Sequence, residues 1–334
     1  MSLSLRLKMI FDIARHKFYE GITFLFLIAI AAVVCGYVAV DINIANATLA
    51  TAPLQPMLRD FMVEHTTWSA IISLVLIMAT SLRLTRATII HSLFSRGSLS
   101  TMSLSAVVIL GIGINGNILS TLFVGYLLSE AINRICFCVS PEPRMHYMFT
   151  ANIAIGAMPL FDSSMLAPAL LAPIVIMLSN KKPREIVVAL VGLLLPIFTY
   201  CYVSWCHGGE FSEGILQIWR GMITPSSLAD VDYLTLPRLI MLGLVLFMQI
   251  GTSLVFLNDR LSLSLSSRQI WILLQVLVVL LTICFVLLPS TSPASFMCIG
   301  LCISAMSPLL FYRIEGIGSI IVFYTLLGVA FWAI

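Results

Sequence analysis

The acidic residues of this chain are few, and three of them fall where a carboxylate could do chemistry. Asp41 stands in YVAVDINIAN, at the end of a long apolar run. A carboxylate there could act as a base or bind a cation held by a phosphate, or it could simply end the run. Asp60 and Glu64, in LQPMLRDFMVEH, are four residues apart and share one face of a helix. That pair predicts a divalent-cation site or, alternatively, the solvated face of a surface helix.

Arginines accompany these acids. Arg59 and His65 flank the Asp60–Glu64 pair, and Arg220 and Arg238 occur in or next to a later polar segment. Guanidinium groups suit phosphate oxygens, because they form charge-assisted and often bidentate hydrogen bonds. We expect Asp41 or Asp60 to be the catalytic base and assign no metal ligand set. The expected substrate-binding residues are Arg59, Glu64, His65, Asp162, Arg220 and Arg238.

Asp162 interrupts an apolar run that extends from Met145 to Asn180. Ser163 and Ser164 follow it, and Asp and Ser side chains accept hydrogen bonds from the first N–H groups of a helix. The sequence therefore predicts a helix cap at Asp162. A carboxylate at membrane depth would instead indicate a functional site.

Glu130 lies inside an apolar segment, in GYLLSEAINR, with Arg134 four residues later. This spacing predicts an ion pair on one helix face, near the cytoplasmic side of the membrane. A role in proton transfer is the alternative.

The composition is that of a membrane protein. The 334 residues are 60% hydrophobic and only 10% charged, and the mean hydropathy is +1.06. The apolar stretches are continuous and approach or exceed the ~20 residues that cross a bilayer as a helix. The net charge of +3 does not indicate nucleic-acid binding. No phosphate-binding loop, G-x-S-x-G or H-E-x-x-H motif is present, so we expect no cofactor beyond a possible divalent cation.

We predict an all-α, polytopic bundle of about 11 transmembrane helices, with the N-terminus inside and the C-terminus outside. With this topology, fifteen of the 18 Lys and Arg residues fall on inside loops, as the positive-inside rule requires. Only Arg59, Arg220 and Arg238 fall outside. The predicted spans are 22–40, 67–82, 101–114, 117–133, 146–160, 164–179, 186–204, 237–256, 269–288, 293–311 and 316–334.

The spans form a single domain, 1–334, with three polar additions. Residues 1–21 predict an interfacial cytoplasmic helix. Outer loops at 41–66 and 205–236 each contain a short amphipathic stretch. In the middle of the chain, 97–133 and 145–180 each predict a hairpin of two helices of about 14–17 residues. Such helices are shorter than the ~30 Å hydrocarbon core, so they must sit inside a bundle.

Several of these segments resemble the core of integral-membrane GT-C glycosyltransferases. They are LQPMLRDFMVEH, NGNILSTLFVGYLL, FTANIAIGAMPLFDSSMLAPALLAPIVIML and KKPREIVVALVGLLLPIF. Over residues 20–334 the pattern is also similar to a family of uncharacterised polytopic inner-membrane proteins of Bacteroidetes-type bacteria. The GT-C resemblance implies a catalytic acid in the first outer loop, where Asp41 and Asp60 lie.

The resemblance implies a protein of the bacterial inner membrane that handles a polyprenyl-phosphate-linked sugar at the outer face. Its expected partners are membrane lipids, including that lipid-linked sugar. A non-catalytic scaffold or accessory subunit of an envelope complex is the alternative, with an envelope protein as the partner. A transporter is the third possibility, and it would require charges buried in the spans, where Glu130 is the one ionisable residue clearly inside.

Overall fold

The computed structural model describes most of the chain, and all the regular structure in the described part is helical. The described residues are 17–41, 52–91, 93, 99–113, 117–138, 145–177, 183–224, 235–259, 263–290, 292–314 and 317–333. The first helices are α2 (Lys17–Asp41), α3 (Gln55–Glu64), α4 (Thr66–Ile90), α5 (Ser100–Val108), the π-helical turn η2 (Ile109–Gly113) and α6 (Ile118–Cys138). The middle of the chain forms α7 (Met145–Phe161), the 3-10 turn η3 (Ser163–Met165), α8 (Leu166–Met177), α9 (Pro183–Cys206) and α10 (Glu213–Ile223). The last elements are α12 (Leu236–Asp259), α13 (Leu265–Leu287), α14 (Pro293–Met306), α15 (Pro308–Arg313) and α16 (Ile317–Ala333).

The helices identify a multi-pass membrane protein. Six described segments are long and apolar enough to cross a membrane: Thr66–Ile90, Ile118–Cys138, Arg184–Cys206, Leu236–Asp259, Leu265–Leu287 and Pro293–Arg313. Shorter apolar helical segments accompany them at Gly21–Cys35, Ser100–Gly113, Ser163–Pro173 and Gly318–Ala333. Helical structure occurs at each of the eleven predicted spans. The predicted interfacial segment 1–21 falls largely outside the described residues.

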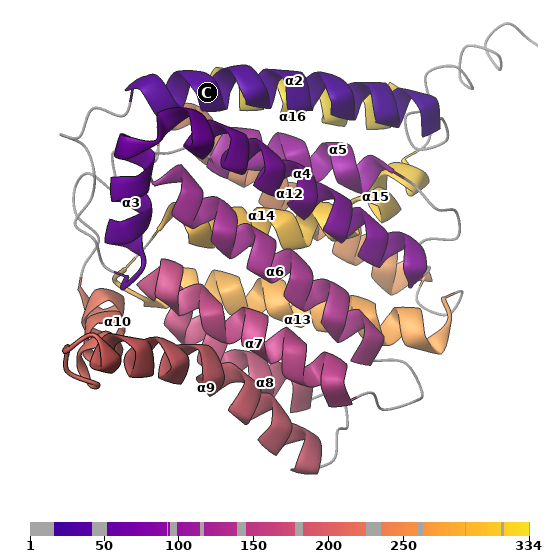
Figure 1. Ribbon diagram of the computed structural model, residues 1–334. Coiled ribbons are helices and arrows are strands. Elements are labelled where there is room, and N and C mark those ends of the chain that lie inside the picture. Colours follow the sequence, from indigo (N-terminus) through magenta and orange to yellow (C-terminus); the bar gives the residue numbers. More distant parts are fainter. Residues whose placement is uncertain are drawn as a thin grey trace, which may run out of the picture.

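The long helices lie side by side, and α14 runs through the middle of the bundle (Figure 1). It packs against α5, α6, α12 and α13, and every residue from Ala294 to Met306 is buried. In the most apolar 18-residue stretch of Pro293–Arg313 every residue is buried, whereas 22% of the residues are buried in the corresponding stretch of α9. Peripheral helices therefore present wide apolar surfaces, as lipid-facing helices do, while α14 contacts only protein.

Two short helices lie at one end of this bundle (Figure 1). α3 begins with Pro56 in its first turn and buries Met62, while Met57 and Val63 stay exposed. α10 buries Ile218 and Met222 against Leu160 and Leu166. Its other face exposes Ile215, Leu216, Trp219 and Ile223. Each of the two amphipathic stretches singled out in the sequence thus forms a helix, and both helices lie at the same end.

The two middle hairpins differ more than the sequence predicts. α7 has 17 residues, and η3 with α8 covers 163–177, so this hairpin is short as expected. The partner in the first hairpin, α6, continues to Cys138 and has 21 residues, which corrects the predicted end at 133. The helix continues past Arg134 because Glu130 accepts a hydrogen bond from this guanidinium within the same helix.

Candidate functional site

The expected catalytic and substrate-binding residues of the first outer loop lie on α3 or beside it. Asp60, Glu64 and His65 are exposed, and Arg59 is half-buried. Asp41 is the last residue of α2, and its side chain lies outside what the structure describes. Asp60 and Glu64 are thus exposed on a surface helix, a position compatible with both alternatives that the sequence left open.

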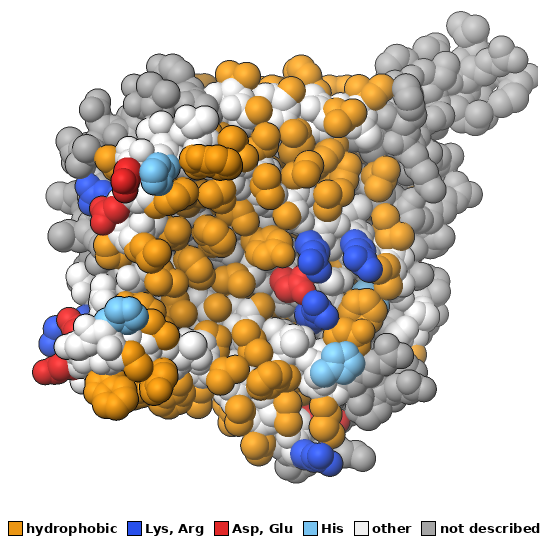
Figure 2. All heavy atoms as spheres, in the orientation of Figure 1, with side chains coloured by type: hydrophobic (Ala, Val, Ile, Leu, Met, Phe, Trp, Pro, Cys, Tyr) orange, Lys and Arg blue, Asp and Glu red, His pale blue; other side chains and the backbone are white. Residues whose placement is uncertain are grey.

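Arg220 is exposed on α10, and Arg238 is half-buried near the start of α12. Figure 2 shows two separate groups of charged side chains at the end of the bundle where α3 and α10 lie. None of the eight predicted site residues lines the apolar cavity described below. Among the described residues no three His, Cys, Asp or Glu side chains come together in an arrangement that could hold a metal ion.

Asp162 is a helix cap, as the sequence predicts. Its Oδ1 accepts hydrogen bonds from the backbone N–H of Ser164 at 3.0 Å and from the Ser164 hydroxyl at 2.7 Å. The same hydroxyl lies 2.8 Å from the hydroxyl of Ser292 and 3.3 Å from that of Ser295. Ser292 in turn caps α14 by accepting from the N–H of Ser295. We call these four residues the serine cluster.

The serine cluster joins two helix N-termini that are far apart in sequence. The start of η3 and α8 meets the start of α14 through contacts spanning 128 and 131 residues. The sequence D-S-S predicts the helix cap at Asp162. It does not predict that the Ser164 hydroxyl contacts Ser292 and Ser295. The only local signal for those serines is Ser292 directly before Pro293, which is typical of a helix start.

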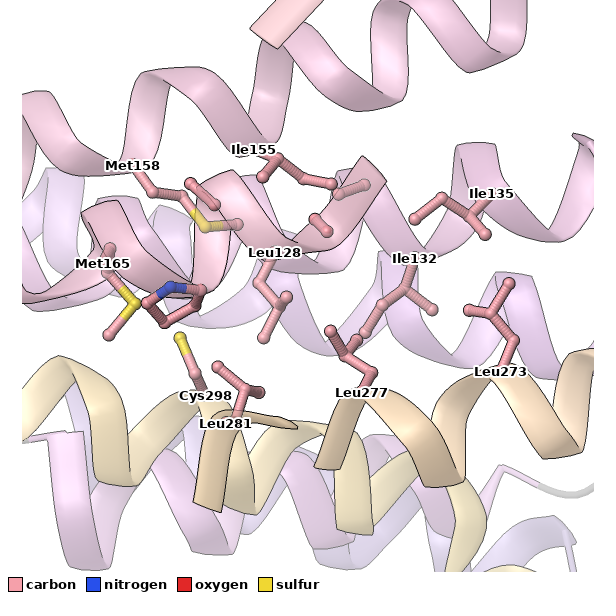
Figure 3. Close-up of a pocket in the computed structure, with 14 residues that line it drawn as sticks. Leu128, Ile132, Ile135, Ile155, Met158, Met165, Leu273, Leu277, Leu281 and Cys298 are labelled. Carbon is pink, nitrogen blue, oxygen red and sulfur yellow. The ribbon is translucent and has the colours of Figure 1, made fainter. Parts of the chain in front are cut away.

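An apolar cavity lies between α6, α7, α8, α13 and α14 (Figure 3). The cavity itself is narrow, with a volume of about 30 Å³, and it lies within a wider gap of about 540 Å³ that is partly open to the surroundings of the bundle. Small side chains leave this room, because Ala131, Ala169 and Ala172 line it where larger residues would fill it. The other lining residues are Leu128, Ile132, Ile135, Ile155, Met158, Met165, Pro168, Leu273, Leu277, Leu281 and Cys298.

The serine cluster stands at one end of this cavity. Met165, which directly follows Ser164, and Cys298, one turn after Ser295, line the same end in Figure 3. Ile135 and Leu273 line the opposite end. α10 packs against η3, so the polar end of the cavity faces the part of the bundle that carries the short amphipathic helices. The lining itself is apolar, and the serine cluster lies next to it rather than among the lining residues.

Asp162→Ala is expected to lower the free energy of unfolding by ~1 kcal/mol, because the first N–H groups of η3 lose their acceptor. Asp162→Asn should lose much less, since asparagine caps about as well as aspartate. Thermal unfolding of the detergent-solubilised protein measures both changes. Equal losses for the two variants would show that the negative charge, rather than the cap, stabilises this turn.

A second polar group lies between α4, α6 and α7. Glu130 Oε1 accepts from Arg134 Nε at 2.6 Å, which confirms the predicted ion pair. Glu130 Oε2 lies 2.7 Å from Nη1 of Arg83, a partner on α4 that the sequence did not predict. Arg134 also lies over the ring of Tyr147 at 5.7 Å from its centroid. Glu130 is 16% exposed and forms ion pairs with two arginines. This arrangement favours a structural ion pair over a role in proton transfer.

No protein-family model, curated protein or solved structure matches this chain. Its function must therefore be inferred from the chemistry of its own residues.

Proposed function

We propose that this protein lies in the bacterial inner membrane and binds the apolar chain of a lipid-linked sugar within its bundle. In this proposal all eleven helical spans cross the membrane, with the N-terminus inside and the C-terminus outside. The α3 and α10 end would face outward. Two observations support that orientation: α16 ends toward the α3 end, and the basic side chains of α4 and α6 lie toward the opposite end (Figures 1 and 2).

The observation that carries the proposal is an apolar cavity that ends at the serine cluster. Its lining offers an isoprenoid or acyl chain a protein surface made of Leu, Ile, Met and Ala side chains. The serine hydroxyls and the Asp162 carboxylate offer hydrogen bonds to the hydroxyl groups of a sugar. The carboxylate would repel a phosphate, so the phosphate of a polyprenyl-phosphate donor would lie farther out. Arg59, Arg220 and Arg238 are cations at that end of the described structure.

A second candidate function is a non-catalytic scaffold or accessory subunit of an envelope complex. The observation that favours it is the exposure of Asp60, Glu64 and His65 on α3. An exposed carboxylate is a poor base for a substrate hydroxyl, because water rather than a positioned hydroxyl lies against it. The same exposed face could instead bind a protein partner.

Filling the cavity tests the first candidate. Ala169 and Ala172 line the cavity and are 2% and 5% exposed. Ala172→Phe should at least halve cross-linking of a photoactivatable polyprenyl-phosphate sugar to the purified protein, because the new ring occupies the place of the chain. Val191→Phe is the matched control, since Val191 is 53% exposed on the outer face of α9 and lies outside the cavity.

The outcomes separate the two candidates. Cross-linking that falls in Ala172→Phe and persists in Val191→Phe supports the cavity as the lipid site. No cross-linking of the unmodified protein, or equal cross-linking of both variants, contradicts it. Co-purification of a membrane or envelope protein that is lost when Asp60 and Glu64 are changed to Ala would then favour the scaffold.

A further inference from the structure

A second binding site is indicated at the other end of the bundle, and it does not depend on the proposed function. Arg83 on α4 and Arg134 on α6 pair with Glu130, and Arg86 lies one turn after Arg83 on the same helix. We call these four residues the arginine patch. Figure 2 shows this group of blue and red side chains over α4 and α6, bordered by hydrophobic surface. Arg83 and Arg134 are 35% and 32% exposed, so the charged heads remain accessible at the surface.

The arginine patch carries more positive charge than it neutralises. Glu130 offsets one charge, while three guanidinium groups contribute three, which leaves a net charge of +2. Among the residues that the structure describes, Arg86 is exposed and forms no ion pair. The neighbouring His91 adds no charge near neutral pH, because burial lowers its pKa. The patch therefore carries an excess positive charge that a bound anion would neutralise.

The surroundings of Arg86 indicate that the missing anion belongs to a lipid. Along α4 the residues Trp68, Ile71, Val75, Met78, Leu82 and Ile89 are each more than 40% exposed. Their spacing of three and four residues makes one apolar stripe along the helix, and Arg86 lies on that stripe, four residues after Leu82. A stripe of this kind on a membrane helix faces acyl chains.

The position of Arg86 along α4 agrees with this interpretation. α4 starts at Thr66, next to α3, and at 1.5 Å per residue Arg86 lies about 30 Å farther along the axis. That distance equals the thickness of the hydrocarbon core, about 30 Å. Arg86 thus lies at the level of the lipid headgroups, at the membrane surface opposite α3. The apolar stripe of α4 crosses the hydrocarbon core between these two surfaces.

We propose that the arginine patch binds the phosphate of an acidic phospholipid whose acyl chains lie along the apolar stripe of α4. Arg86 supplies an unpaired guanidinium, and Arg83 and Arg134 face the same phosphate from their ion pairs with Glu130. Guanidinium groups hold phosphate oxygens through two parallel hydrogen bonds, which lysine cannot do. Basic sites between transmembrane helices at the membrane surface are typical binding places for acidic lipid headgroups.

The test measures retained lipid on the full-length protein by native mass spectrometry, with phosphatidylglycerol and phosphatidylcholine offered at equal concentration. We expect preferential retention of phosphatidylglycerol, and Arg86→Gln should weaken it by about fivefold, the worth of one basic residue near an anionic headgroup. Arg184→Gln, at an exposed arginine near the start of α9 and outside the arginine patch, is the matched control and should change little. Arg86→Lys should weaken retention less than Arg86→Gln, because it keeps the charge.

Three results would overturn the proposal. The first is equal retention of the two lipids, and the second is an equal loss in Arg86→Gln and Arg184→Gln. The third is full protection by inorganic phosphate in a thermal-shift experiment, which would indicate a soluble phosphate ester as the ligand. Folding of Arg86→Gln is verified by an unchanged melting temperature without added lipid, since Arg86 contributes no ion pair within the described chain.

Discussion

Gly156→Ala is expected to lower the free energy of unfolding by about 3 kcal/mol, more than any other single methyl group added to a described helix. Gly156 lies where α7 crosses α9, and a Cβ built there would overlap the carbonyl oxygen of Leu193. The obstacle is backbone, so no rotamer change relieves it, and the two helices must separate. The α9 residue Gly192 faces the carbonyl oxygen of Phe149 in the same way, with a Cβ at 2.7 Å. Small residues at both positions let two membrane helices approach closely.

Gly243→Ala and Gly328→Ala provide the controls. Both glycines are helical and exposed, and no atom lies within 4 Å of a Cβ built on either of them. Alanine favours a helix over glycine by about 0.5–1 kcal/mol, so these variants should be neutral or slightly more stable. Melting temperatures in one detergent measure all three. A Gly156→Ala protein as stable as the Gly243→Ala protein would contradict the close crossing of α7 and α9.

Glu130→Ala is expected to cost ~2–3 kcal/mol. The variant removes the carboxylate that accepts from Arg134 and pairs with Arg83, and it leaves three guanidinium groups close together. Breaking a buried ion pair from one side leaves an uncompensated charge, which costs more than the pair itself is worth. We place the cost below that of a fully buried pair because both arginines are about one-third exposed.

The Asp259–Arg313 pair is the reference for Glu130. It joins α12 and α15 at 3.7 Å, with side chains that are 27% and 58% exposed. Asp259→Asn should therefore cost less than 1 kcal/mol, as is usual for exposed pairs. Changing both Glu130 and Arg83 to Gln should cost less than the sum of the single changes, because the second change removes the stranded charge. Additive costs in this double-mutant cycle would show that the two side chains do not interact.

The positions of the helices could be predicted because hydropathy is a local property. Each apolar segment between charged loops forms a helix, from α2 to α16. The error at the end of α6 has a physical cause. Arg134 was taken as a loop residue, yet a carboxylate one turn earlier neutralises it and the helix continues to Cys138. The sequence correctly predicts the ion pair between Glu130 and Arg134. It does not show that this pair lets the helix continue beyond residue 133.

The candidate sites could be predicted only in part, because they depend on contacts between distant segments. Asp162 was correctly predicted as a cap, since its hydrogen bonds go to Ser164, two residues away. The contact of Ser164 with Ser292 and the pairing of Glu130 with Arg83 join residues that are 128 and 47 positions apart. The apolar cavity leaves even less trace in the sequence, because alanine and leucine at its lining are ordinary residues for any membrane helix.

The complete burial of α14 has a consequence for how anything reaches the interior. A bundle whose axis is occupied by a helix has no central aqueous route, since α14 is packed by α5, α6, α12 and α13. The empty space instead lies off-axis, between α14 and the helices α6, α7, α8 and α13. A molecule that dissolves in the bilayer can approach such a space sideways and leave its head at the surface. The architecture therefore favours lateral entry from lipid over passage from one aqueous side to the other.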